Sequence, residues 1–104
     1  SGVGEAADGD AVYTGARVKI SNSKITDNQE CGVILDEGGS VELEHVTVSR
    51  NKCGVGFSGA GSLLANNSVF ADLEMGAVAI KKGCENIAKV RGSGNKGLTI
   101  PKNK

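Results

Sequence analysis

Apolar residues along this chain come in short runs, in which they are β-branched or alternate with polar residues. Examples are Val18-Lys19-Ile20, Val41-Glu42-Leu43 and Val46-Thr47-Val48. Such runs favour β-strands, because successive side chains of a strand face opposite sides. Glycine-rich breakers separate the runs, and no stretch keeps apolar residues at helical spacing for a dozen positions. The pattern therefore predicts an all-β chain built from short strands.

The runs recur with a fixed period. Four glycines stand 22, 22 and 21 residues apart, and their neighbours repeat with them, as in Cys31-Gly32-Val33 and Cys53-Gly54-Val55. We interpret these glycines as one position of a repeated unit: Gly32, Gly54, Gly76 and Gly97. A period in the low twenties is typical of a solenoid, in which each unit buries its apolar side against its neighbours. The sequence predicts a right-handed parallel β-helix with coils of about 22 residues.

One unit is complete between Ile20 and Leu35, where the pattern is apolar-x-Asn-Ser-x-Ile-x-x-Asn-x-x-x-Gly-Val-x-Leu. It resembles the repeat of pectin-lyase-like proteins, and the resemblance covers about four coils. Lyases, hydrolases, epimerases, carbohydrate-binding modules and non-catalytic interaction domains share that fold, so the resemblance implies a fold and not a function. We expect a flexible Gly-rich segment at residues 1–10, a β-helix domain at 11–100 belonging to a longer protein, and a tail at 101–104.

Stacked coils place equivalent residues in columns along the axis. We expect one column of the core to hold Ile20, Leu43, Ala65 and Ile87, and another to hold Val33, Val55, Ala77 and Leu98. Asn28 and Asn51 share one turn position, where stacked amides can hydrogen-bond along the axis and satisfy backbone groups. His45, the only histidine, falls between Asn22 and Asn67 in its column. These columns predict structural asparagines and a polar turn edge rather than a catalytic pocket.

Cys31 and Cys53 also share a column. A rung spacing of about 4.8 Å is compatible with a disulfide, but parallel side chains leave the Cβ atoms farther apart than the preferred ~3.8 Å. The chain has three cysteines, an odd number, which argues against a disulfide framework. We therefore expect two reduced thiols packed as small hydrophobes. Reduced thiols, with no signal-peptide pattern at Ser1, favour an intracellular location.

Residues suited to catalysis or metal binding do not gather in the repeat. Calcium needs several converging oxygens and glycoside hydrolysis needs two carboxyls at a defined separation. Asp36 and Glu37 have no acidic counterparts in the neighbouring units. Arg50 separates Asp27 from Asp72 in their column, which we interpret as charge compensation along the stack. Cysteine and histidine do not occur with zinc-site spacing. We expect no catalytic residue, no metal and no cofactor in these coils.

The outward positions offer a candidate binding surface. On the strand after each repeat glycine they form a small, apolar column: Tyr13, Ile34, Gly56, Val78 and Thr99. An outward apolar stripe indicates contact with another surface, either a partner or a terminal segment of the same chain. Twelve basic and twelve acidic residues cancel, so no global field attracts nucleic acid or an anionic membrane.

These observations favour a non-catalytic β-helix scaffold that presents a rigid surface to a protein partner or to the remainder of a parent chain. The alternative is a carbohydrate-binding or polysaccharide-processing fragment, lyase-like or hydrolase-like, whose active residues lie on missing coils. A third interpretation is end-to-end self-association through the open edges of the coils. We expect neither nucleic acid nor a membrane as a partner.

Overall fold

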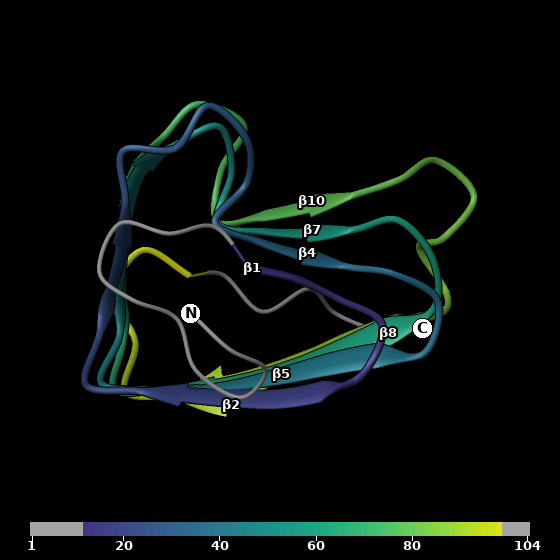
Figure 1. The fold of residues 1–104 in the computed structure, drawn as a ribbon, viewed down its shortest axis with the longest axis horizontal. Helices are drawn as coiled ribbons and strands as arrows, with labels where there is room; N and C mark the ends of the chain where they lie inside the picture. The colour runs from purple at the N-terminus through teal and green to yellow at the C-terminus, as the bar shows by residue number, and fades with distance from the viewer. Residues whose placement is uncertain (1–11, 99–104) are drawn as a thin grey trace.

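The computed structural model describes residues 12–98, with side chains from residue 15 onward. Every regular element in this part is a β-strand, and the chain winds through successive coils whose strands stack into three parallel sheets (Figure 1). This confirms the predicted right-handed parallel β-helix. The segments predicted at residues 1–10 and 101–104 lie outside the described residues.

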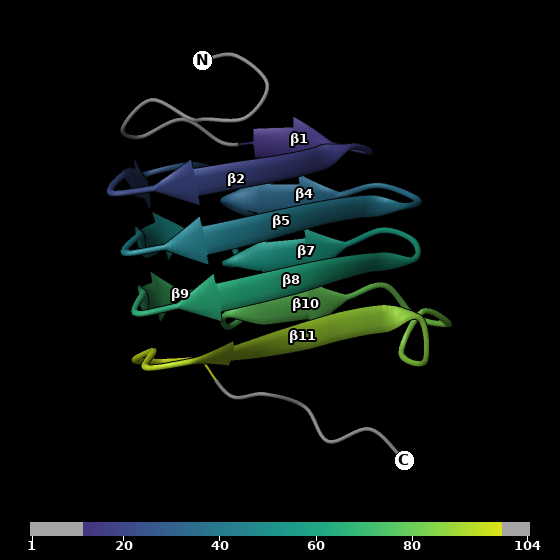
Figure 2. The same ribbon diagram turned by 90° about the horizontal axis from the view of Figure 1, so that it is seen from below.

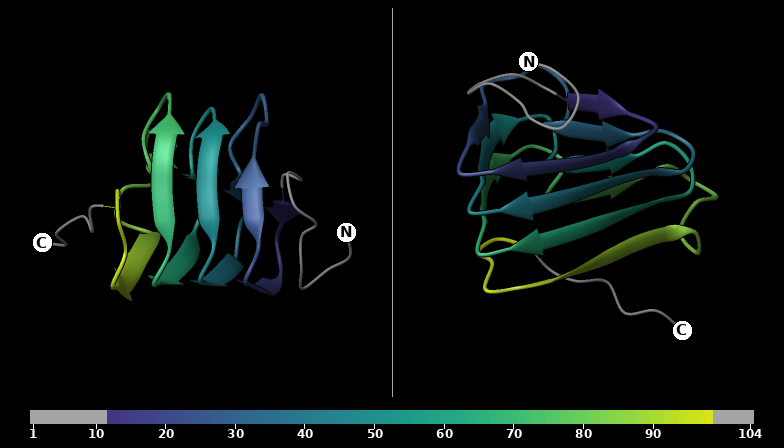
Figure 3. Two further views of the ribbon diagram at one scale, coloured as in Figure 1. Left: turned by 90° about the vertical axis from the view of Figure 1, so that its left-hand side faces the viewer. Right: turned by 60° about the horizontal axis from the view of Figure 1, so that its bottom comes forward.

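Three parallel sheets enclose the core, and we name them A, B and C. Sheet A consists of β1 (Val12–Thr14), β4 (Val33–Leu35), β7 (Val55–Phe57) and β10 (Val78–Ile80). Sheet B consists of β2 (Arg17–Ser21), β5 (Gly39–Glu44), β8 (Gly61–Asn66) and β11 (Ala88–Ser93). Sheet C consists of β3 (Lys24–Thr26), β6 (Thr47–Asn51) and β9 (Val69–Leu73). Figure 2 shows the rungs stacked from β1 to β11, and Figure 3 turns sheet C toward the viewer.

The core fills the space between the three sheets. Burial alternates along sheet B, as in β5, where every second residue is buried. Each sheet sends aliphatic side chains inward with no exposed surface, among them Ile20 and Leu43 from sheet B, Ile25 from sheet C and Val33 from sheet A. Each such side chain contributes about 1.5–3 kcal/mol of hydrophobic stabilisation. The inward columns predicted for the first two complete units are therefore present.

A sharp corner joins sheet B to sheet C in every coil. The corner residues are in the left-handed backbone region and lie one above another: Asn22 (φ 51°), His45 (φ 56°), Asn67 (φ 53°) and Gly94 (φ 72°). Asparagine and glycine are the residues that adopt this conformation at least cost. His45 thus lies between Asn22 and Asn67, as the repeat predicted, and its side chain is 60% exposed.

The third coil is displaced by one residue from the predicted alignment. Asn51 pairs with Leu73 on sheet C, but Val55 pairs with Val78 on sheet A, so the intervening turn has gained one residue. Gly32 and Gly54 are equivalent positions, as predicted, whereas Gly76 stands opposite Cys53. The equivalence assigned to Gly76 was wrong, because Gly76 closes the longer turn with a φ of 92° and an N–H bond to the Leu73 carbonyl.

The fourth coil is displaced further. Three residues separate β7 from β8, but seven separate β10 from β11. As a result Gly92 pairs with Ala65, and Ile87, expected in the core column with Ala65, is 44% exposed. The Phe70 N–H donates to the Lys96 carbonyl, which places Gly97 beside Phe70 rather than in the glycine column. The repeat position assigned to Gly97 was therefore also wrong.

Candidate functional site

The apolar stripe predicted on the outer face of sheet A is interrupted. The residues in register there are Tyr13, Ile34, Gly56 and Ala79, so Ala79 occupies the place predicted for Val78. Val78 instead lies in the inward column with Val33 and Val55 and packs against the core. The assignment of Val78 was wrong because of the extra residue in the preceding turn. Thr99 and the side chain of Tyr13 lie outside the described residues.

A disulfide joins Cys31 to Cys53, which corrects the expectation of reduced thiols. Both cysteines lie just outside the strands, and their Cα atoms are 4.2 Å apart. Cys53 is fully buried. Because disulfides persist in oxidising compartments, the argument from free thiols for an intracellular location no longer holds. Cys84 remains a free cysteine.

The disulfide covers part of the predicted stripe. A Cβ atom added to Gly56 would lie 3.3 Å from the Cys31 sulfur and 3.5 Å from the Cys53 sulfur. Gly56 is therefore buried beneath the disulfide on its outer side, and glycine is the residue that leaves room for it. Among the described side chains, Ile34 is the remaining apolar member of the predicted stripe, and it is half-buried.

The asparagine column has the structural role predicted for it. The Asn51 side chain accepts hydrogen bonds from the backbone N–H (3.0 Å) and side-chain amide (2.9 Å) of Asn28, and donates one to the Ile25 carbonyl (2.9 Å). Asn95, in a different corner, likewise accepts a hydrogen bond from the Ser68 backbone N–H and donates one to the Ala65 carbonyl. Each amide holds the corner of the preceding coil, which fixes the direction in which the chain leaves the sheet.

Replacing Asn51 with alanine is expected to lower the free energy of unfolding by about 2–3 kcal/mol, because it leaves the Asn28 N–H and the Ile25 carbonyl without their partner in a buried corner. Urea unfolding followed by circular dichroism measures this. Asn28→Ala is the matched control, since it removes a single bond to Asn51 and should cost less than about 1 kcal/mol. Equal losses in the two variants would contradict this role of Asn51.

A column of alternating charge runs along the corner at the end of sheet C. Arg50 donates to both carboxylate oxygens of Asp27, at 2.7 and 3.2 Å, and Asp72 lies on the other side of Arg50. The hydrogen bond from Arg50 lowers the pKa of Asp27, and the same contact raises the pKa of Arg50. All three residues are in the left-handed backbone region and are exposed. The predicted charge compensation between Asp27 and Arg50 is therefore present.

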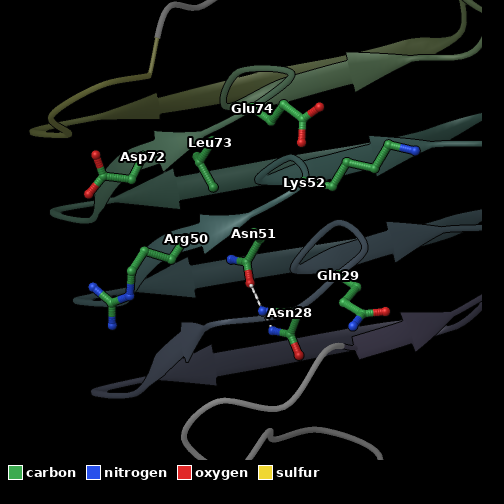
Figure 4. Close-up of a pocket in the computed structure, with 8 residues that line it drawn as sticks. All are labelled: Asn28, Gln29, Arg50, Asn51, Lys52, Asp72, Leu73 and Glu74. Carbon is green, nitrogen blue, oxygen red and sulfur yellow. Dashed lines mark hydrogen bonds between the residues drawn. The ribbon is translucent and has the colours of Figure 1, made fainter.

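An open groove of about 660 Å³ lies beside this column, at the turn from sheet C to sheet A (Figure 4). Its lining residues are Asn28, Gln29, Arg50, Asn51, Lys52, Asp72, Leu73 and Glu74. Asn51 is engaged with Asn28, and Arg50 with Asp27. Two cations and two carboxylates line the groove, so its charges balance and it offers no preference for a charged ligand.

The outer face of sheet B has a different character. Its outward residues form in-register columns across all four strands, and we call this surface the sheet B face. The first column is Arg17, Ser40, Ser62 and Lys89. The second is Lys19, Glu42, Leu64 and Arg91. The third is Ser21, Glu44, Asn66 and Ser93. A groove of about 370 Å³ crosses the face, and it is lined mainly by the first two columns.

The sheet B face carries more positive than negative charge. Lys19 lies 3.9 Å from Glu42, and Glu44 is occupied by His45 (3.3 Å) and the Asn67 amide (2.8 Å). The face has three other cations, and within residues 12–98 none of them forms an ion pair with a carboxylate: Arg17, Lys89 and Arg91. Since the whole chain is neutral, this excess of positive charge is local to the face.

Sequence reasoning missed the sheet B face because it placed β11 in the wrong register. The alignment that placed Ile87 beside Ala65 moved Lys89 and Arg91 off this sheet. The seven residues between β10 and β11, which include Gly83 and Cys84, were the signal that could have corrected it. An insertion in a turn shifts everything that follows while leaving each strand pattern intact.

In residues 12–98 we find no cluster of three or more histidine, cysteine or acidic side chains placed to share a metal ion. The same part of the chain has no helix that is long and apolar enough to cross a bilayer.

The fold and the stacked columns define this chain as a parallel β-solenoid. It belongs to the family described as "right handed beta helix region", whose match extends over residues 4–100. No curated protein and no solved structure matches the chain.

Proposed function

We propose that this chain is a non-catalytic β-helix scaffold that presents a rigid surface to a protein partner, and that this surface is the sheet B face. The observation that carries the proposal is the composition of the face: a half-buried Leu64 lies among basic, acidic and hydroxyl side chains in register. An apolar centre surrounded by charged and polar groups is typical of protein–protein interfaces.

The construction of the face supports this role. Its outward residues alternate along the strands with fully or almost fully buried ones, such as Leu43, Leu63 and Val90. Every strand of the sheet is hydrogen-bonded to a neighbouring coil. A surface held by a packed core and by ladder hydrogen bonds loses little conformational entropy when a partner binds.

The test is site-specific photocrosslinking in the producing organism, with a photoreactive residue at position 64 of the sheet B face or, as the control, at position 71. Ala71 is exposed on sheet C and so lies on another face. We expect a protein to be crosslinked from position 64 and not from position 71. The captured protein, once purified, should bind the wild-type chain and lose binding to Leu64→Glu, whose outward side chain leaves the fold unchanged.

Two results would contradict this proposal. One is equal crosslinking from positions 64 and 71, or binding of the captured protein that Leu64→Glu does not weaken. The other is release of unsaturated or reducing-end products from an acidic polysaccharide incubated with the chain, which would favour the polysaccharide-processing alternative.

A further inference from the structure

Resting on the proposed function, we infer that the partner of the sheet B face is an extended protein segment that is acidic at both ends and apolar in the middle. The two ends of the segment would lie over Arg17 in the first coil and over Lys89 and Arg91 in the fourth. Its apolar middle would lie over Leu64.

The positions of Arg17, Lys89 and Arg91, which pair with no carboxylate within residues 12–98, define the ends. Arg17 and Lys89 occupy one column and are separated by the strands that carry Ser40 and Ser62. Three strand spacings correspond to about 14 Å. An extended chain covers this distance with about four residues, so acidic residues four positions apart can meet both ends of the column. The serine hydroxyls between the cations can donate to, or accept from, the backbone of such a segment.

The centre of the face selects against a uniformly acidic polymer. Glu42 is the neighbour of Leu64 in the second column. Its carboxylate lies 3.9 Å from the Lys19 ammonium group and neutralises that charge. A polymer with an acid group on every unit would bring a negative charge over Glu42, and like charges placed together cost free energy. A protein segment can place an apolar side chain there, which buries Leu64 and avoids the repulsion.

The stacking surfaces that a nucleic acid would use are likewise not on this face. The aromatic side chains that the structure describes, Phe57 and Phe70, are both buried. Single-stranded nucleic acids bind largely through stacking of bases on aromatic rings. The described face instead offers cations to an acidic partner and one apolar contact at Leu64.

The test uses the labelled peptide Glu-Glu-Gly-Leu-Gly-Glu-Glu as a probe, with fluorescence anisotropy at low ionic strength. We expect saturable binding that weakens as salt is added. The double variant Arg17→Glu and Arg91→Glu should raise the dissociation constant at least about tenfold, because it reverses the charge at both ends of the face. The matched control is Lys81→Glu with Lys82→Glu, an identical charge change on exposed residues of the turn between β10 and β11. It should leave binding within about twofold.

Three further probes separate the possible failures. Weaker binding of a peptide with serine in place of leucine would support the apolar contact at Leu64. Equal binding of the corresponding lysine peptide, or no binding of the acidic one, would overturn this inference alone if position 64 still captures a protein. Binding of polygalacturonate at the sheet B face, with none of any peptide and no captured protein, would overturn both this inference and the proposed function.

Discussion

Replacing both Cys31 and Cys53 with serine is expected to lower the free energy of unfolding by about 3 kcal/mol. The disulfide joins residues 22 positions apart, and it limits the conformations open to the unfolded chain. In a domain of this size that loss corresponds to a fall in melting temperature of roughly 12 °C or more. Urea or thermal unfolding of the double variant, and of the wild type with and without a reductant, measures it.

The control for the disulfide is the remaining cysteine. Cys84 lies in the turn between β10 and β11 and is free, so Cys84→Ser should leave both stability and its response to reductant unchanged. If reduction leaves the melting temperature of the wild-type chain unaltered, the disulfide does not contribute to stability as inferred.

Replacing Gly92 with alanine is expected to destabilise the chain by at least about 3 kcal/mol. Gly92 pairs with Ala65 and has a φ of 150°, a conformation that residues with a Cβ rarely adopt. A Cβ at this position would also overlap the Ala65 carbonyl oxygen, which is backbone and cannot move aside without separating β11 from β8. Equilibrium unfolding measures the loss, and hydrogen exchange of β11 shows whether the strand detaches.

Gly83→Ala is the control that introduces the backbone strain without the steric overlap. Gly83 also has a positive φ, 94°, but a Cβ there would meet no atom within 4 Å. Its replacement therefore introduces backbone strain alone, which costs about 1–2 kcal/mol. A loss for Gly92→Ala no larger than that for Gly83→Ala would show that β11 does not pack on β8 as the register requires.

The columns that sequence reasoning placed correctly belong to the first two complete coils, whose strand patterns coincide. Ile20 and Leu43 stack in the core, and Asn22 and His45 stack at the corner, because 23 residues separate each pair and the strand patterns coincide. The charge column at Asp27 and Arg50 follows from the same regularity. The separation falls to 22 residues between Val33 and Val55, so in these coils the strand patterns, and not a constant period, locate each residue.

The candidate surfaces were less predictable because they depend on small changes in the turns. One extra residue before Val78 moved it from the outer face into the core. The longer turn before β11 brought Lys89 and Arg91 onto the sheet B face. A turn insertion changes no strand pattern, so the sequence around it still fits the repeat while every later residue faces a different neighbour.

By itself, the sequence determined the β-helix, because short apolar runs at a period in the low twenties can bury their surface only by stacking on one another. Tertiary structure alone decided which side chains share a face. It showed that Cys31 and Cys53 approach closely enough outside the strands to form a disulfide, which covers Gly56. It also showed that cations from the first and fourth coils meet on one sheet. The physical reason is that hydrophobic periodicity encodes the direction of each side chain relative to the core, whereas the register between coils is set by the lengths and conformations of turns.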